Sequence, residues 1–427
     1  MSIYTRKFLK VAWIISLIVS PSFLEAAPQV QSGDLIFRHN IQILVDHGVV
    51  NSPVTTWPLS WDALLKDLKK SKSNDRPLPN KILPIFNKVL ARALKETRRG
   101  KFSYSSGFSF SKDPMNIRGF SNTPRETSEI GGKFSWFNKH ASIDLKVNSV
   151  INSSNSREFR ADGSQIGIEL GNWTIGASLM DRWWGPGWDG SLILSSNARP
   201  IPSLVINRNL TNPFDIYWLK WIGPWDVQII LGQLEKDRSI PNANFFGMRI
   251  NFRPLESLEI GISRSAQWCG DSRPCNFNTF KDLWLGKDNV EDDGILFDNE
   301  PGNQMAGFDF RWSNLWIGTP ISVYGQFIGE DEAGGLPSRY LAQFGFEVSG
   351  LMSNGSYRWF AEWAGTSCQA LKNKFVSCGY RQNIYQSGYT YKNRIIGHGL
   401  DNDASVFTFG TIFTSPENNF WQAYKTF

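Results

Sequence analysis

Tryptophan and arginine are concentrated in one stretch, Asp181 to Arg208, which reads DRWWGPGWDGSLILSSNARPIPSLVINR. Its indoles surround a Gly-Pro-Gly sequence that suits a tight turn. An indole face stacks on the apolar face of a sugar ring, and an arginine binds a carboxylate through paired hydrogen bonds. This chemistry suits an acidic saccharide. The same indoles also suit packing at a membrane interface or inside the fold.

The stretch supplies the first group of candidate polysaccharide-binding residues. They are Arg182, Trp183, Trp184, Trp188, Asn197 and Arg199. The Gly-Pro-Gly sequence indicates that backbone shape matters here, which favours a structural role for the tryptophans. The arginines of the stretch are Arg182, Arg199 and Arg208, and each suits either an acidic glycan or an ion pair inside a β-barrel, where charge ladders are common. Ion pairs inside the barrel are the favoured role for at least two of the three.

A second aromatic and basic block, YQSGYTYKNRIIGH, lies near the C-terminus. Hydroxyl-bearing rings beside cations suit an anionic sugar polymer, and a strand pair with a polar loop explains the block equally well. Its candidate binding residues are Tyr385, Tyr389, Tyr391, Arg394 and His398.

Catalytic and metal-binding patterns find little support in this sequence. It has four histidines and no His-Glu-x-x-His, Gly-x-Ser-x-Gly or glycine-rich phosphate loop. The acidic residues Asp288, Glu291, Asp292 and Asp293 lack the ligand spacing of a calcium loop, so a solvated loop is the better interpretation. We therefore predict a protein that is not an enzyme, with no metal and no cofactor. A pair of carboxylates for glycoside hydrolysis needs only to be close in space, so the sequence leaves open whether such a pair exists.

The first 26 residues have the pattern of a secretory signal peptide. Three basic residues precede the apolar run Val11 to Val19, and a cleavage site follows after Ala26. Residues 1–26 carry three basic residues and one acidic residue, so their removal lowers the formal net charge from +6 to +4. Long basic runs of the kind that bind nucleic acid are absent from the sequence.

Four cysteines in an exported chain indicate disulfides. They form two local pairs, each of which closes a short loop, and the other two pairings remain open at this stage. The pairs are Cys269 with Cys275 and Cys368 with Cys378.

Residues 27–100 have the periodicity of a small helical domain. Asp34 is placed to cap a helix that stops before Gly48, and Ser60 is placed to cap a second. A third helix is expected over about 83–97. Because so few residues bury little apolar surface, this bundle is expected to lean on the rest of the chain.

The period changes from 3.6 to 2 after Gly100. Segments such as 225–232, 305–312 and 341–350 alternate and are rich in aromatic residues and glycine. We count about eighteen such segments in residues 101–427, with the spacing of membrane strands joined by turns and longer loops. The chain ends in FWQAYKTF, and a terminal aromatic on an amphipathic strand is typical of outer-membrane barrels. The predicted fold is mainly β, a transmembrane antiparallel β-barrel.

Three blocks together resemble the capsule assembly Wzi family of outer-membrane proteins. The first is DRWWGPGWDGSLILSSNARPIPSLVINR, the second is RQNIYQSGYTYKNRIIGHGLDND, and the third is SGDLIFRHNIQILVDHGVV followed by TTWPLSW. The resemblance spans nearly the whole chain after residue 26. It implies a barrel of eighteen strands, located in the outer membrane, with the helical domain at or in its periplasmic mouth. The cysteine pairs match no pattern of that family.

The resemblance also implies a function. It is that of a surface lectin that binds capsular polysaccharide, here expected to be acidic, and helps attach or assemble the capsule. The expected partners are this polysaccharide, outer-membrane lipid, the barrel insertion machinery and the capsule exporter. Two alternatives stay open: a specific porin for saccharides or other small solutes, and a glycan-modifying enzyme of the outer membrane.

Overall fold

A computed structural model of the chain describes residues 29–73, 78–152, 155–284, 302–333, 336–353, 355–368, 378–415 and 420–426. The predicted signal peptide, the acidic loop around Asp288 and the terminal Phe427 lie outside these residues. The described part is mainly β, as predicted. Its largest element is one sheet of 16 strands, against the predicted count of about eighteen.

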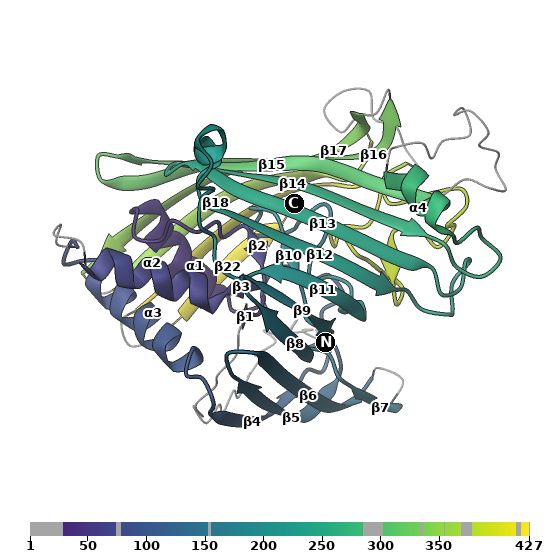
Figure 1. The fold of residues 1–427 in the computed structure, drawn as a ribbon, viewed down its shortest axis with the longest axis horizontal. Helices are drawn as coiled ribbons and strands as arrows, with labels where there is room; N and C mark the ends of the chain where they lie inside the picture. The colour runs from purple at the N-terminus through teal and green to yellow at the C-terminus, as the bar shows by residue number, and fades with distance from the viewer. Residues whose placement is uncertain are drawn as a thin grey trace, which may run out of the picture.

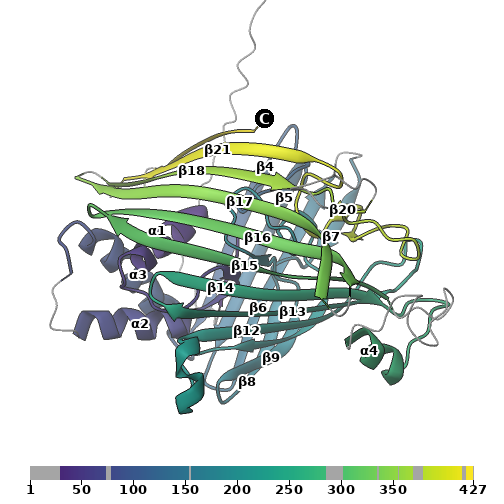
Figure 2. The same ribbon diagram turned by 90° about the horizontal axis from the view of Figure 1, so that it is seen from above.

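The sheet forms a curved wall in which strands that follow one another along the chain lie side by side (Figures 1 and 2). All its ladders are antiparallel. Its strands are β4 (Phe102–Phe110), β5 (Ser128–Phe137), β6 (Ala141–Ile151), β7 (Arg157–Arg160), β8 (Gln165–Leu170), β9 (Trp173–Ser178), β11 (Ser203–Arg208), β12 (Trp225–Gln233), β13 (Asn244–Leu255), β14 (Leu258–Trp268), β15 (Gly302–Trp316), β16 (Thr319–Ala333), β17 (Leu336–Met352), β18 (Gly355–Gly365), β21 (Ser405–Thr414) and β22 (Phe420–Thr426). The path ends at β4 and β22, which are not paired with each other in the described residues.

The wall is apolar outside and polar inside. On β18, Trp359 is exposed on the outer face, whereas its neighbours Arg358 and Phe360 are buried. On β21, Phe407 and Phe409 are exposed while Thr408 between them is buried. This alternation is the reverse of a soluble sandwich and is typical of a wall that faces lipid. No helix of the described residues is long and apolar enough to cross a membrane.

Two of the three helices of the N-terminal region begin directly after the predicted capping residues, and the third begins without a side-chain cap. They are α1 (Leu35–Asp46), α2 (Trp61–Ser73) and α3 (Leu83–Glu96). The Asp34 carboxylate accepts a hydrogen bond of 2.9 Å from the Phe37 N–H, and the Ser60 hydroxyl accepts one of 3.3 Å from the Ala63 N–H. A short helix, α4 (Phe277–Trp284), and a 3₁₀ turn, η1 (Tyr217–Ile222), join wall strands and were not predicted.

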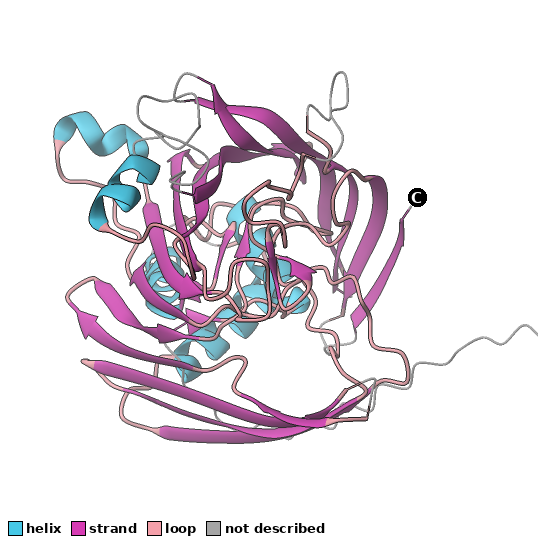
Figure 3. Cartoon of the chain, turned by 90° about the vertical axis from the view of Figure 1, so that its right-hand side faces the viewer, coloured by secondary structure: helices cyan, strands magenta, loops and turns pink. Residues whose placement is uncertain are grey.

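Helix α1 inserts into the interior of the wall, whereas α2 and α3 cover its end. Eleven of the twelve residues of α1 are buried, but α2 and α3 bury only one face each. Figure 3 shows helices and loops inside the ring of strands. The helices lie at the end where the wall turns are short, as between β15 and β16, and the long connections lie at the other end. In outer-membrane barrels the short turns are periplasmic.

Residues 181–202 leave the wall after β9, run through the interior and return at β11. Inside, β10 (Trp183–Trp184) pairs with β2 (Thr56–Trp57). We call α1, β2 and residues 181–202 together the plug. Three smaller pieces complete the regular structure. They are β1 (Gln29–Val30), its partner β3 (Leu59–Ser60), and a hairpin of β19 (Thr390–Tyr391) with β20 (Arg394–Ile395).

The cysteines form two local disulfides, Cys269–Cys275 and Cys368–Cys378. Both lie in connections at the end of the wall away from α1, α2 and α3. Sequence proximity, the basis of the prediction, therefore identified the pairing correctly.

Candidate functional site

The tryptophans of the 181–208 stretch are covered by protein. Trp183 and Trp184 are 0 % exposed and Trp188 is 4 % exposed. Trp183 faces Trp57 across the β10–β2 ladder, and the ring of Phe120 meets both indoles edge-on at 5.1 and 5.3 Å. In this structure the indoles pack the plug, which is the structural role that the Gly-Pro-Gly sequence favours.

Arg38 of α1 holds the Gly-Pro-Gly turn in place. Its Nη2 donates to the carbonyl oxygens of Pro186 at 2.9 Å and Gly187 at 2.7 Å. Its guanidinium lies 4.3 Å from the ring centroid of Trp188, a cation–π distance. Burial lowers the pKa of Arg38 to about 9, so it stays a cation at neutral pH. Sequence analysis did not single out Arg38, because a lone arginine in an amphipathic helix carries no motif.

Glu362 on β18 binds the next turn of the stretch from the wall. Its carboxylate accepts the backbone N–H of Trp188 at 2.7 Å, and those of Asp189 and Gly190 at 3.2 Å each. The Tyr324 hydroxyl donates to the same carboxylate at 2.7 Å. One inward-facing wall side chain thus satisfies three successive backbone donors that the turn leaves without partners.

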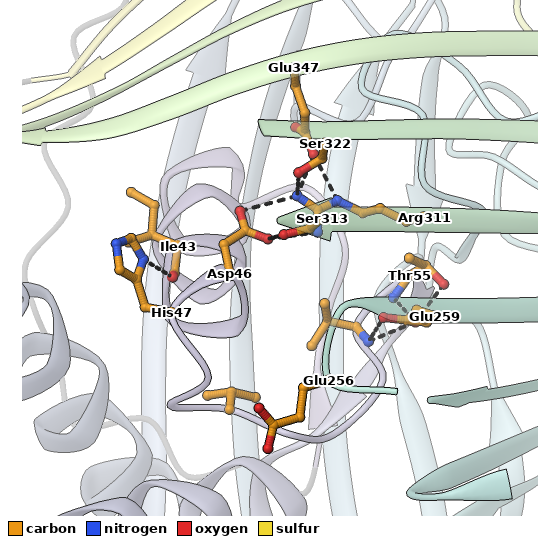
Figure 4. Close-up of polar contacts among 12 residues, drawn as sticks. Ile43, Asp46, His47, Thr55, Glu256, Glu259, Arg311, Ser313, Ser322 and Glu347 are labelled. Atoms are coloured by element: carbon orange, nitrogen blue, oxygen red, sulfur yellow. Dashed lines mark hydrogen bonds and ion pairs between the residues drawn. The ribbon is translucent and has the colours of Figure 1, made fainter. Parts of the chain in front are cut away.

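A charge network joins α1 to the wall (Figure 4). Arg311 on β15 donates to the Asp46 carboxylate at 2.7 and 3.1 Å, and its Nε donates to Glu347 at 2.7 Å. Arg358 on β18 donates to the other Glu347 oxygen. All four side chains are at most 4 % exposed. Ion pairs inside the barrel were predicted for at least two of Arg182, Arg199 and Arg208. Of these three, Arg199 alone has an ion pair among the described residues, and Arg311 and Arg358 form the network that binds α1.

Figure 4 also shows a second carboxylate of the wall, that of Glu259, beside this network. Glu259 on β14 accepts the backbone N–H groups of Val54 and Thr55 at 2.9 and 2.8 Å. The Thr55 hydroxyl donates to the same oxygen at 2.7 Å. The segment between α1 and β2 is therefore joined to the wall through backbone and hydroxyl donors rather than through an ion pair.

Arg182 lies in a pocket between the plug and the wall. The pocket is lined by Met180, Asp181, Arg182, Leu194, Ser195, Ala198, Arg199, Pro200, Ile201, Ser203, Ile230, Phe245 and Ile396. The guanidinium of Arg182 has two long hydrogen bonds, of 3.3 Å to Ser178 and 3.4 Å to Gln228. Among the described residues it has no carboxylate partner, and burial alone lowers its pKa to about 10.

The other polar candidates of the stretch are engaged within the protein. Arg199 forms two hydrogen bonds of 2.9 Å with the Asp162 carboxylate. Asn197 donates its amide N–H to the Ile395 carbonyl at 3.0 Å, which ties the stretch to the hairpin of β19 and β20. Arg199 keeps about a quarter of its side chain exposed, but Asn197 is buried.

The second aromatic block is divided between a buried base and an exposed tip. Tyr385 and Tyr389 are buried and donate to the backbone oxygens of Cys269 at 3.0 Å and Ile193 at 2.8 Å. Tyr391 and His398 are buried as well, and burial lowers the pKa of His398.

The turn that links β19 to β20 is exposed. Lys392 and Asn393 have φ of 52° and 60°, the left-handed conformation of a tight hairpin turn. Arg394 follows them and donates to Asn116 at 2.7 Å in an exposed contact. The basic residues of this block therefore reach solvent at the end of the wall that carries the long connections.

Residues 95–424 match the family model of the capsule assembly protein Wzi. The chain belongs to this family. It is 32 % identical over 361 residues to the Klebsiella pneumoniae "Uncharacterized 55.8 kDa protein in cps region". The aligned region covers 83 % of this chain and 69 % of that protein. Among solved structures it is similar to Escherichia coli Wzi, with 28 % identity, a TM-score of 0.81, and coverage of 94 % of this chain and 85 % of that one. The chain is an outer-membrane protein with the fold of the Wzi barrel, as the sequence predicted.

Among the described residues, one cluster of potential metal ligands lies where the plug meets the wall. Oxygens of Asp189 and Glu362 and a ring nitrogen of His398 lie within 4.8 Å of one another. Both Glu362 oxygens already accept hydrogen bonds from the plug, and Asp189 accepts one of 3.0 Å from Thr408. The two carboxylates are therefore engaged in contacts between plug and wall, whereas Nε2 of His398 is buried without a hydrogen-bond partner among the described residues. The absence of a metal stays a prediction.

Proposed function

We propose that this protein is a non-enzymatic surface lectin that binds capsular polysaccharide and helps attach or assemble the capsule on the cell. Membership of the Wzi family supports this function. The similar Escherichia coli structure is that of a carbohydrate-binding β-barrel involved in group 1 capsule assembly. Contacts with outer-membrane lipid, with the barrel insertion machinery during biogenesis and with the capsule exporter are part of the same proposal.

The exposed basic hairpin supports a site at the outer end of the wall. Lys392 and Arg394 flank a turn whose base is held by buried tyrosines, so the cations are presented on a rigid support. Arg199, which is partly exposed, lies on a segment that is hydrogen-bonded to the same hairpin through Asn197. A rigid array of cations suits carboxylates of an acidic glycan. We assign the buried candidates, including all three tryptophans, the role of holding this surface in shape.

Deletion of the gene tests the function. We expect capsule to be released into the medium while its synthesis continues, and full-length protein supplied from a plasmid to restore retention. A Lys392→Ala/Arg394→Ala variant should reach the membrane but retain less capsule and bind purified capsule more weakly. Arg99→Ala, which removes an exposed arginine at the helical end, is the matched control. Cell-bound capsule that is unchanged on deletion would refute the function.

A porin for small solutes is the alternative from another class. The interior of the wall holds the plug, and two clusters of buried apolar residues run through it. A lumen filled in this way opposes free diffusion. We expect planar bilayers that contain the purified protein to show no robust current, and an open-channel current would favour the porin. Turnover of purified polysaccharide by the protein in detergent would favour the enzyme alternative.

A further inference from the structure

Three neighbouring wall strands are too short to cross a hydrocarbon layer. Strands β8, β9 and β11 have six residues each, whereas a membrane strand needs about nine to eleven. Strand β8 pairs with only the first part of β6, Ala141 to Asp144. The chain leaves the wall after β9 to form the plug and rejoins it at β11. The wall is therefore shorter here, and its edge at the end opposite α1, α2 and α3 is set back.

A large apolar groove follows this edge. Its volume is about 890 Å³, in the range of ligand sites. Five exposed apolar side chains on the outer face of β6, β8, β11 and β12 form its floor, and we call it the rim groove. They are Leu145, Val147, Ile166, Leu204 and Leu231. Exposed apolar groups of a barrel face the acyl chains of the bilayer.

The rim groove adjoins the pocket that contains Arg182. Ser203 and Phe245 line both cavities, and the Ser178 hydroxyl, which accepts a hydrogen bond from Arg182, lines the groove. The guanidinium therefore lies just inside the wall, behind the edge over which the groove runs.

The charges of the Arg182 pocket do not balance. Arg199 is paired with Asp162, and Asp181 is paired with Arg125 at 2.9 Å. Arg182 is left over as a buried cation, although burial of an unpaired charge is costly. Among the described residues, Arg249 and Arg311 are paired with the carboxylates of Asp309 and Asp46. Arg253 and Arg118 are buried without an ion pair in the same part of the chain, but both donate to backbone carbonyl oxygens, of Val50 at 2.9 Å and Thr123 at 2.8 Å, whereas Arg182 has only its two long hydrogen bonds to neutral side chains. The pocket therefore lacks one anion.

We propose that the rim groove and Arg182 together bind a lipid of the outer leaflet that has an anionic phosphate headgroup. The acyl chains lie on the apolar floor of the groove, and the phosphate reaches over the short edge of the wall to accept hydrogen bonds from Arg182 and Ser178. The apolar floor supplies affinity for the chains, and the unpaired guanidinium supplies the preference for an anion. This inference does not depend on the proposed polysaccharide site.

Native mass spectrometry of the full-length protein in a neutral detergent tests the site. Phosphatidylglycerol and phosphatidylcholine with identical acyl chains are titrated separately. We expect the wild type to bind one phosphatidylglycerol about tenfold more tightly, the value of one charge-assisted contact. Arg182→Gln should abolish this preference, and Arg394→Gln, which alters a basic residue outside the groove, should keep it. Equal binding of both lipids by the wild type would overturn the proposal.

Two further experiments distinguish the contribution of the apolar groove from that of the Arg182 cation. Ala177→Trp places a bulky ring on the exposed outer face within the groove, and it should weaken both lipids while inorganic phosphate binding is unchanged. Dodecyl phosphate should compete with phosphatidylglycerol far better than inorganic phosphate does. Displacement of the lipid by capsule fragments but not by dodecyl phosphate would show that Arg182 serves the polysaccharide, and would refute the lipid site alone.

Discussion

Asp46, the last residue of α1, and Arg311, on wall strand β15, are joined by two hydrogen bonds in a region closed to water. Because Arg311 also binds Glu347, the removal of its charge leaves two carboxylates with less compensation. We expect Arg311→Gln to lower the free energy of unfolding by about 3–5 kcal/mol. Urea titration of the refolded protein in lipid vesicles measures this loss.

The control for this ion pair lies at the surface of the helical domain. Arg99 and Asp62 form a pair of 3.2 Å between two partly exposed side chains. We expect Arg99→Gln to change stability by no more than about 1 kcal/mol. If both variants lose the same free energy of unfolding, burial does not explain the contribution of the Asp46–Arg311 pair to stability.

Gly190 lies where the plug turn touches His398. An added Cβ at this position would lie 2.0 Å from the His398 ring, and the backbone of the turn is held by Glu362 on the other side. We expect Gly190→Ala to cost at least about 1–3 kcal/mol and to reduce the folded fraction seen as a heat-modifiable band in gel electrophoresis. Gly107→Ala is the matched change, since no atom lies within 4 Å of its Cβ. Equal folded fractions would contradict a close fit at Gly190.

Trp184 tests whether the central stretch is structural. Its indole is fully buried and donates to Gln228 at 3.3 Å. We expect Trp184→Ala to lower stability by about 3–5 kcal/mol and to reduce the amount of protein in the membrane. A variant that folds normally and has lost only capsule retention would show instead that the indole contacts the polysaccharide.

His39 of α1 makes stability depend on pH. Its ring accepts from the Arg358 guanidinium at 3.4 Å and lies 3.0 Å from the Ser356 hydroxyl. Burial, followed by the charge of Arg358, holds the pKa of His39 well below its usual 6.5, and Glu347 offsets only part of this. The unfolded chain therefore binds a proton that the folded chain does not. Stability is fully present above about pH 6.5 and falls as pH drops below it.

The measurement is a series of urea titrations between pH 7.5 and pH 5. We expect a loss of about 1.4 kcal/mol per pH unit from His39 below pH 6.5. His398, which is also buried with a lowered pKa, adds to the slope in the same direction. His39→Gln should reduce the slope. A wild-type slope that is unchanged in this variant would contradict the assignment to His39.

Local patterns were sufficient for the three N-terminal helices, for the strand character of residues after Gly100 and for the disulfides, but not for α4, η1 or the number of wall strands. The caps at Asp34 and Ser60 depend on a few neighbouring residues, and inside–outside alternation is visible within each strand. The residues that hold the plug were not found in the same way. Arg38, Glu362 and Arg311 each stand alone in an ordinary strand or helix, and their partners lie 148, 174 and 265 residues away.

The sequence by itself determined the barrel, the N-terminal helical region and the family. Hydrophobic periodicity, helix-capping residues and unusual composition are all properties of contiguous residues. Only the tertiary structure decided what the Trp-rich stretch does. Burial and pairing depend on which wall strands surround it, and these come from residues far along the chain. The wall and the plug together cover the three indoles, whereas Lys392 stays exposed, Arg394 stays half-buried, and Arg182 has no carboxylate partner among the described residues.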